Sequence, residues 1–383
     1  MAHECLFTMD ASSIKFGVGA TREVGFEARR LAMKKVMVVT DPGLSESDAV
    51  KTTLESLRAD DIDYFLYDRV RVEPTDGSLQ EAIDCAMGDD FDGFVAVGGG
   101  SSIDTAKAAN LYSTYPADFL AYVNPPVGEG RPIPGALKPL IAVPTTAGTG
   151  SEVTRVTVIT DAERHVKMML LDDHLLCDAA LVDFELSLSC PRDLTAFVGV
   201  DSLTHAIESY VSSKANPVTE DWSLRAAALI GAHLRRAWAE PEDREARAAM
   251  ALGATLAGMA FSNASVALVH GMSRPIGGHF GVPHGLSNAV LLPEVTRWSL
   301  PGAPERYRRI AEVLGVDDLV GALQQLNDDL EIPRLATLAE RDRFDAVTAE
   351  MAEAALESGS PAFNPRVPGA DEVVALYATA YDA

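Results

Sequence analysis

The sequence predicts an α/β half, residues 1–190, followed by an all-helical half, residues 191–383. In the first half, short apolar runs alternate with amphipathic stretches, which is typical of a parallel sheet covered by helices. After Pro191 the strand-like runs stop, and long stretches rich in alanine and leucine follow. A chain of 383 residues, 47% of them hydrophobic, is long enough to form two domains with separate cores.

Each half contains segments whose apolar spacing predicts a particular element. The predicted strands are 36–39, 64–67, 94–97 and 140–143. The helices expected between them lie near 45–59, 78–88 and 101–113. The helices expected in the second half include 218–239, 243–262, 304–314, 343–357 and 371–381. The cluster of prolines and glycines at 124–135 predicts an ordered loop.

Charge and cysteine content exclude several classes of partner. The formal net charge of −24 argues against nucleic acid and against an anionic membrane surface, because both require a basic face. Four scattered cysteines without C-x-x-C spacing suit reduced thiols. The first residues lack a basic start followed by an apolar run, and no stretch has the apolar length of a membrane span. We therefore expect a cytoplasmic protein.

A triple glycine follows the predicted strand 94–97 and opens directly into a predicted helix. Glycines let the backbone approach a phosphate closely, and the start of a helix offers free N–H groups. The candidate phosphate-binding residues are Gly98, Gly99, Gly100, Ser101 and Ser102. An ordinary strand-to-helix turn explains the same glycines, and the segment does not match G-x-G-x-x-G.

A second candidate loop, 144–154, follows the predicted strand 140–143 and carries hydroxyls at Thr145, Thr146 and Thr149. These groups can hydrogen-bond a pyrophosphate and a ribose. Asp41, at the end of the first predicted strand, is a candidate for the ribose hydroxyls, which favours NAD over NADP. Asp41 is equally explained as a helix N-cap before Pro42. Lys167 is a candidate contact to the ribose or nicotinamide, and a solvated side chain is the alternative for this lone lysine.

Four side chains in the second half have the chemistry of a divalent metal site. Asp201 and His205 are four residues apart, which on a helix places both on one face. His270 and His284 come from short stretches flanked by glycine, where a loop or helix end can turn a ring inward. One carboxylate and three imidazoles suit Fe²⁺, Zn²⁺ or another first-row metal. A surface or second-sphere pair is the alternative for Asp201 and His205.

These motifs resemble the iron-containing, group III alcohol dehydrogenases of the dehydroquinate synthase-like fold. The matching segments are 98–107, 144–154, 199–210, 270–277, 283–288, and an ending with 364–366 followed by 376–377. The resemblance implies an N-terminal nucleotide domain, a helical metal-binding domain, and NAD and Fe²⁺ (or Zn²⁺) held between them. It also implies that Asp201, His205, His270 and His284 are the metal ligands, and that the protein is a homodimer or a higher homo-oligomer.

One position departs from the family pattern. Many members have a second histidine four residues after the third ligand, where this chain has Arg274. Arginine cannot act as a general base. Either a proton leaves through a ribose hydroxyl and water, or Arg274 binds an anionic substrate tail through its two-pronged guanidinium. An internal ion pair of Arg274 at the interface between the two domains is at least as good an explanation.

The leading hypothesis is an NAD-dependent, metal-activated dehydrogenase that interconverts a small alcohol and its aldehyde. The alternative is a hydroxyacid–oxoacid transhydrogenase, or a semialdehyde reductase acting on an acid-tailed substrate. A dehydroquinate synthase-type lyase would require more basic residues beside the ligands, and maleylacetate reductases dispense with the metal. A catalytically silent nucleotide-binding protein is the hypothesis from a different class.

Overall fold

The computed structural model describes residues 6–161, 163 and 166–383. The chain divides into two compact units. The N-terminal unit, Asp10–Cys190, is α/β, and the C-terminal unit, Pro191–Ala383 with residues 6–9, is helical. The fold class predicted from the sequence is confirmed.

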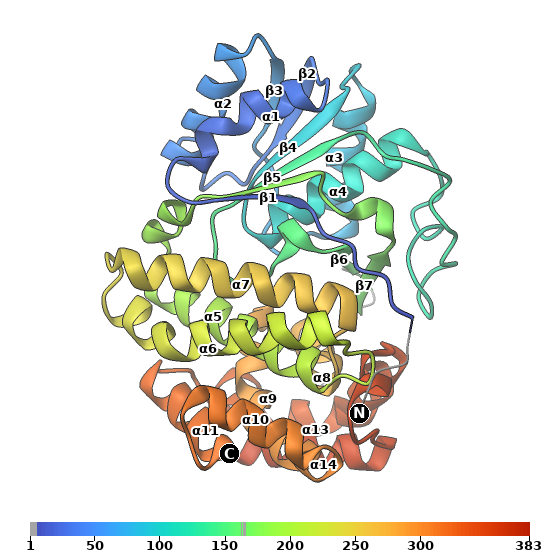
Figure 1. The fold of residues 1–383 in the computed structure, drawn as a ribbon. Coiled ribbons are helices and arrows are strands. Elements are labelled where there is room, and N and C mark those ends of the chain that lie inside the picture. Colours follow the sequence, from blue (N-terminus) through green and yellow to red (C-terminus); the bar gives the residue numbers. More distant parts are fainter. Residues whose placement is uncertain (1–5, 162, 164–165) are drawn as a thin grey trace. The chain divides into compact units, whose positions relative to one another are not determined.

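The N-terminal unit is built on a six-stranded parallel sheet in the order β1-β8-β5-β4-β2-β3 (Figure 1). Its strands are β1 (Ser13–Phe16), β2 (Lys35–Val39), β3 (Asp63–Tyr67), β4 (Gly93–Gly98), β5 (Leu140–Pro144) and β8 (Ala179–Val182). Its α-helices are α1 (Val24–Arg30), α2 (Asp48–Ala59), α3 (Asp76–Met87) and α4 (Gly100–Thr114). An antiparallel hairpin, β6 (Val156–Asp161) and β7 (Val166–Leu171), lies outside the sheet. The 3₁₀ turns are η1 (Ala20–Glu23), η2 (Ser151–Val153), η3 (Asp173–Leu175) and η4 (Phe184–Ser189).

Alternate residues of the central strands enter two different cores. Val95 and Val97 of β4 pack in one apolar cluster with residues of α1 and α2. Phe94 and Ala96 of the same strand pack in a second cluster with residues of α3 and α4. Because side chains alternate across a strand, β4 is buried on both faces, which explains why it reads as a continuous apolar run.

Several elements differ from the sequence-based expectation. Strands β1 and β8 and the hairpin β6–β7 were not expected, because the four residues of β1 carry a lysine and the other runs are short or polar. The N-cap of α2 is Ser47, which accepts a hydrogen bond from Val50 N. The alternative explanation of Asp41 as a helix N-cap is therefore wrong: its Oδ1 accepts from Gly43 N at 2.9 Å in a turn.

The C-terminal unit is a helical bundle. Its α-helices are α5 (Arg192–Val211), α6 (Pro217–Ala239), α7 (Arg244–Ala264), α8 (Leu268–Phe280), α9 (His284–Ser299), α10 (Pro304–Leu314), α11 (Leu319–Asp329), α12 (Leu335–Leu338), α13 (Arg341–Glu357) and α14 (Ala370–Asp382). Two 3₁₀ turns, η5 (Leu300–Gly302) and η6 (Ser360–Phe363), complete it. Both α8 and α9 contain an internal proline, which obscured them in the sequence. Gly271 of α8 has no room for a side chain, since a Cβ would lie 2.5 Å from Pro361 Cγ in η6.

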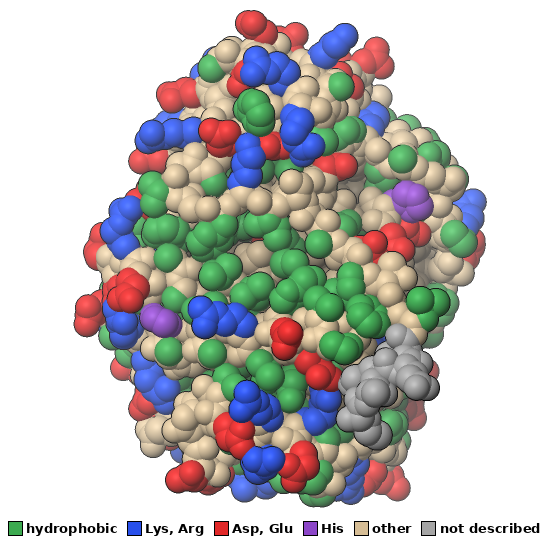
Figure 2. Space-filling view, in the orientation of Figure 1, with side chains coloured by type: hydrophobic (Ala, Val, Ile, Leu, Met, Phe, Trp, Pro, Cys, Tyr) green, Lys and Arg blue, Asp and Glu red, His purple; other side chains and the backbone are tan. Residues whose placement is uncertain are grey.

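No single helix among the described residues is long and apolar enough to cross a membrane. The pair α7 and α8 passes the length and composition test together, with a bend of 102° at the break between them. Figure 2 shows acidic and basic side chains interspersed on the visible face, without a continuous basic patch there.

Candidate metal centre and nucleotide loops

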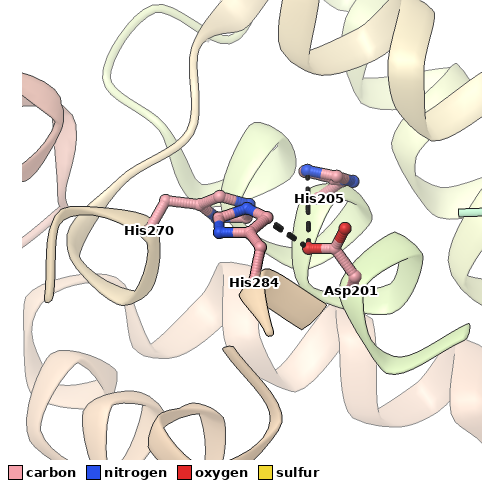
Figure 3. A group of neighbouring side chains, drawn as sticks. All are labelled: Asp201, His205, His270 and His284. Carbon is pink, nitrogen blue, oxygen red and sulfur yellow. Dashed lines mark ion pairs between the residues drawn. The ribbon is translucent and has the colours of Figure 1, made fainter. Parts of the chain in front are cut away.

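Four side chains from three helices of the C-terminal unit converge on one point (Figure 3). Asp201 and His205 lie one turn apart on α5, whereas His270 comes from α8 and His284 is the first residue of α9. Their ligand atoms all lie within 4.8 Å of one another. The structure therefore brings together all four residues that the sequence nominated as metal ligands.

The spacing of these atoms fits a divalent metal. Asp201 Oδ1 lies 3.7 Å from His205 Nε2, 3.6 Å from His270 Nε2 and 3.8 Å from His284 Nε2. Proteins bind such a cation with bonds of about 2.0–2.2 Å, so Asp201, His205, His270 and His284 would hold one by moving closer together. One oxygen and three nitrogens suit Fe²⁺ and Zn²⁺ equally.

Three of the four candidate ligand side chains are buried, and the fourth is partly exposed. The side chains of Asp201, His205 and His270 are at most 5% exposed, whereas that of His284 is 38% exposed. The His205 ring stacks on Phe261, with 4.3 Å between ring centroids, which fixes the plane of the imidazole. A substrate would reach the ligand cluster from the His284 side.

Glu208 of α5 holds His270 in place. Its carboxylate accepts hydrogen bonds from His270 Nδ1 at 2.6 Å, from Val269 N at 2.6 Å and from Ala267 N at 2.9 Å. The same carboxylate thus satisfies backbone N–H groups that the first turn of α8 leaves unpaired. With Nδ1 donating to Glu208, the lone pair of His270 Nε2 is directed at the cluster.

Asn288 lies one turn after His284 on α9, and its amide faces the same cluster. Asn288 Nδ2 donates to Asp201 Oδ1 at 2.6 Å and lies 3.2 Å from His270 Nε2 and 3.3 Å from His284 Nε2. Its buried Oδ1 has no hydrogen-bond partner among the described residues. Asn288 therefore contacts three of the four candidate ligands and holds the Asp201 carboxylate in place.

The titration of the cluster reflects burial and mutual charge. Burial acts to raise the pKa of Asp201, but the surrounding imidazoles, His205 first, hold it well below its usual range. Loss of solvation within the cluster lowers the pKa of His284 from its usual value, against the opposing effect of Asp201. Burial also acts to lower the pKa of His270, but hydrogen bonds to Asp201 and Glu208 raise it above its usual value. The carboxylate is thus ionised and ready to bind a cation.

Arg274 lies one turn after His270 on α8. Its Nη1 donates to Ser360 Oγ of η6 at 3.0 Å, and among the described residues no carboxylate lies within 4.0 Å of the guanidinium. The internal ion pair considered from the sequence is therefore wrong. Burial lowers the pKa of Arg274 to about 10, with Glu208 opposing the shift, so that the side chain stays cationic at neutral pH.

In the N-terminal unit, the two predicted nucleotide loops lie side by side at the carboxyl ends of adjacent strands. Gly98 of β4 pairs in register with Pro144 of β5, and Thr145 N donates to Gly98 O at 3.0 Å. A Cβ on Gly100 would lie 2.9 Å from Thr149 Cγ2, and one on Gly99 would lie 3.5 Å from Thr146. The glycines therefore let the threonine loop pack directly on the start of α4.

The glycine turn also occupies the position where nucleotides bind in open α/β sheets. Connections leave β2 and β4 in opposite directions, toward β3 and β5, and ligands bind at such a switch point outside the strand ends. Gly99 caps α4 without a side-chain hydrogen bond to its first N–H groups. Ser101 Oγ accepts from Glu73 N at 3.0 Å, and Ser102 is buried.

The remaining two candidates have partners of their own. Asp41, in the loop after β2, accepts from Gly43 N. Lys167 of β7 forms an ion pair with Glu73 and donates to Thr160 Oγ1 at 2.8 Å. Contacts of Asp41 and Lys167 with a nucleotide therefore stay predictions.

The sequence reasoning missed positioning residues around both sites. Glu208 and Asn288 lie one helical turn after a nominated ligand, a spacing that could have found them. Lys107 is buried, and its Nζ donates to the carbonyls of Ser151 at 2.8 Å, Thr154 at 2.5 Å and Val156 at 3.1 Å, which ties α4 to the threonine loop. No spacing in the sequence indicates those contacts.

Comparison with known proteins agrees with this geometry. The family model "Iron-containing alcohol dehydrogenase" matches residues 11–184, and the C-terminal model of the Fe-containing alcohol dehydrogenase family matches residues 195–381. A mitochondrial hydroxyacid-oxoacid transhydrogenase of Xenopus tropicalis is 42% identical over 347 residues, which cover 82% of this chain and 75% of the relative. A 1,3-propanediol dehydrogenase of Klebsiella pneumoniae is 36% identical, with 96% of each chain covered. A crystal structure of a 1,3-propanediol oxidoreductase superposes with a TM-score of 0.91 at 35% identity, covering 98% of this chain and 100% of that chain. The chain belongs to the iron-containing alcohol dehydrogenase family and is an oxidoreductase.

Proposed function

We propose that the protein is a metal-dependent oxidoreductase that moves a hydride between NAD(H) and a small alcohol or aldehyde. In the oxidative direction, the alcohol carbon gives a hydride to the nicotinamide and the hydroxyl gives up a proton, leaving the aldehyde, NADH and H⁺. The observation that carries the proposal is the convergence of Asp201, His205, His270 and His284 within 4.8 Å, with His284 partly exposed.

Asp201, His205, His270 and His284 would hold Fe²⁺ or Zn²⁺. When bound, such a cation acts as a Lewis acid toward the oxygen of the substrate. Glu208 keeps the His270 ring in the orientation and tautomer that a metal ligand requires, and Asn288 fixes the Asp201 carboxylate. Phe261 restricts rotation of His205.

For the nucleotide, the support is the packed pair of loops in the N-terminal unit. The first turn of α4 would take the pyrophosphate through the N–H groups that follow Gly99, and the hydroxyls of Thr145, Thr146 and Thr149 would bind phosphate or ribose. Asp41 favours NAD over NADP, because a 2′-phosphate would meet a like charge. Lys167 would approach the ribose or nicotinamide through its remaining N–H.

A test of the proposal uses anaerobically purified protein loaded with Fe²⁺ or Zn²⁺ and NADH deuterated at C4. Small aldehydes are supplied, and the alcohol product is examined by mass spectrometry. The NADH carries deuterium at both C4 positions, because an enzyme transfers only one of the two hydrogens. Transfer of one deuterium to the former carbonyl carbon supports the proposal. NADH consumption without deuterium in the product, or no turnover across the aldehyde series, contradicts it.

A second candidate is a hydroxyacid–oxoacid transhydrogenase, favoured by the relative of that name at 42% identity. In such a cycle the hydroxyacid reduces a nucleotide that stays bound, and the oxoacid then takes the same hydride. Deuterium transfer from a hydroxyacid to an oxoacid without added nucleotide, in protein that retains NAD on purification, would favour it over the dehydrogenase.

We also propose a reducing, cytoplasmic setting and a homo-oligomer. Cys85 and Cys177 are free thiols, which supports a reducing compartment, although the transhydrogenase relative is named as mitochondrial. The edge strand β1 exposes Phe16, with Val18 exposed just beyond it, and an apolar edge of this kind supports pairing with a second copy. Light scattering on the purified protein measures the oligomer directly.

A further inference from the structure

Arg274 follows His270 by one turn of α8, and no carboxylate of the described residues lies within ion-pair distance of its guanidinium. It belongs to the same face of α8 as His270, because residues four apart on a helix lie one above the other. Ser360 Oγ accepts one of its five N–H groups and leaves the others available.

The charges around the site favour an anion. A bound divalent cation and Arg274 together carry one positive charge more than the two buried carboxylates, Asp201 and Glu208. Glu208 lies beyond ion-pair distance of Arg274, and its oxygens already accept from backbone N–H groups and from His270 Nδ1. A substrate with a carboxylate would balance the excess and supply the missing acceptor.

The guanidinium is also held in position, which a binding group requires. Ser360 lies in η6, next to Pro361, and Pro361 packs so tightly on Gly271 of α8 that a Cβ there would clash. Tyr377 Oη donates to Met272 O at 2.6 Å and fixes the same helix from α14. A guanidinium group that is already ordered loses little conformational entropy when it binds a planar carboxylate.

We propose that Arg274, positioned by Ser360, binds the terminal carboxylate of the substrate, so that the enzyme selects acid-tailed alcohols and aldehydes over neutral ones. The proposal rests on the function proposed above and deepens it. His270 and Arg274 are separated by about 6 Å along the helix axis, which suits a short substrate with the acid and the reacting carbon at opposite ends. Neutral substrates of the same length would leave the guanidinium unpaired.

The kinetic test compares butanal with the four-carbon aldehyde that carries a terminal carboxylate. For Arg274→Gln, we expect kcat/KM to fall about 100-fold for the acid-tailed aldehyde and less than about threefold for butanal. Arg274→Lys keeps the positive charge but not the planar guanidinium. Its kcat/KM should fall about 10-fold for the acid-tailed aldehyde and stay unchanged for butanal. Ser360→Ala should also lower kcat/KM for the acid-tailed aldehyde, by less than Arg274→Gln does. Arg308→Gln, on the exposed surface of α10, is the matched control and should behave as the native protein.

A binding readout that does not depend on turnover accompanies the kinetics. Zinc-loaded native protein without nucleotide is titrated calorimetrically with 4-hydroxybutyrate and with 1,4-butanediol. We expect the acid to bind more tightly than the diol, and Arg274→Gln to remove that difference while its metal content and unfolding temperature stay near the native values.

The results of these experiments distinguish a failure of the proposed role of Arg274 from a failure of the proposed dehydrogenase function. Equal losses for both aldehydes in Arg274→Gln, or equal binding of acid and diol by native protein, would overturn the role of Arg274 and leave the dehydrogenase proposal intact. Absence of turnover with every aldehyde would overturn the function, whereas the calorimetric comparison would still decide whether Arg274 binds a carboxylate.

Discussion

Replacing Glu208 with glutamine tests whether this carboxylate tunes the metal centre or only caps a helix. The amide oxygen can take the place of Oε2 and keep the contacts with Ala267 N and His270 Nδ1. The amide NH₂ then faces Val269 N, which now lies 2.6 Å from the acceptor Oε1. The side-chain NH₂ and the Val269 N–H are both donors, so they would face each other without an acceptor. Position 208 is only 3% exposed, so water cannot easily supply one.

The expected magnitude follows from those contacts. Leaving one buried N–H without an acceptor costs about 1–3 kcal/mol, and each retained hydrogen bond weakens by about 1 kcal/mol when its acceptor loses its charge. The lower desolvation cost of a neutral side chain offsets part of this, so we expect the free energy of unfolding to fall by roughly 2–4 kcal/mol. Because a metal-bound histidine depends on the partner of its second nitrogen, metal affinity should fall about 10- to 100-fold.

The assay is competition between the metal-free protein and a chelator of known affinity for Zn²⁺, with thermal unfolding measured on the same samples. Glu294→Gln is the matched control: Glu294 is a buried glutamate of α9 that accepts from Arg297 and Gln324 and contacts no ligand. It should lose stability without losing metal affinity. If Glu208→Gln unfolds more easily but binds Zn²⁺ within about twofold of the native protein, the positioning role is refuted.

Three further predictions follow from the two sites. Because the pKa of His270 is raised, its contribution to the stability of metal-free protein is present below the unfolded pKa near 6.5 and is lost as pH rises through the folded pKa, whereas metal binding needs the neutral ring. The rise in unfolding temperature caused by a fixed Zn²⁺ concentration should therefore grow from about pH 6 to pH 8, and a constant rise would contradict this. Lys107→Met leaves three carbonyls without their donor, so NADH affinity measured by fluorescence should fall about 10-fold with metal affinity unchanged; native affinity for NADH would show that Lys107 does not position the loop. Gly100→Ala forces Thr149 away from α4 and should weaken NADH binding at least about 10-fold, while Gly77→Ala, where a Cβ meets nothing within 4 Å, should leave it unchanged.

The sequence was sufficient where one local pattern determines the structure. The buried strands β2, β4 and β5 read as apolar runs because both of their faces enter a core. The spacing of Asp201 and His205 placed them on one helix face, and the glycine turn marked the start of α4. In each case neighbouring residues carry the whole signal.

The sequence was insufficient where distant segments decide the outcome. The helix α8 contains three glycines and a proline and is stabilised by contacts from elsewhere, among them Glu208 at its first turn and Tyr377 on its side. The partner of Arg274 could not be read from the chain, because Ser360 is 86 residues away. The role of Asp41 in a turn depended on where α2 begins.

The most direct test of the central claim is a metal titration of chelator-treated protein, followed by NADH-dependent reduction of a short aldehyde. If Asp201, His205, His270 and His284 hold the catalytic cation, activity is absent without metal, rises linearly with added Fe²⁺ or Zn²⁺, and reaches a plateau at one ion per chain. Full activity in protein shown by elemental analysis to contain less than about 0.05 ion per chain would contradict the account.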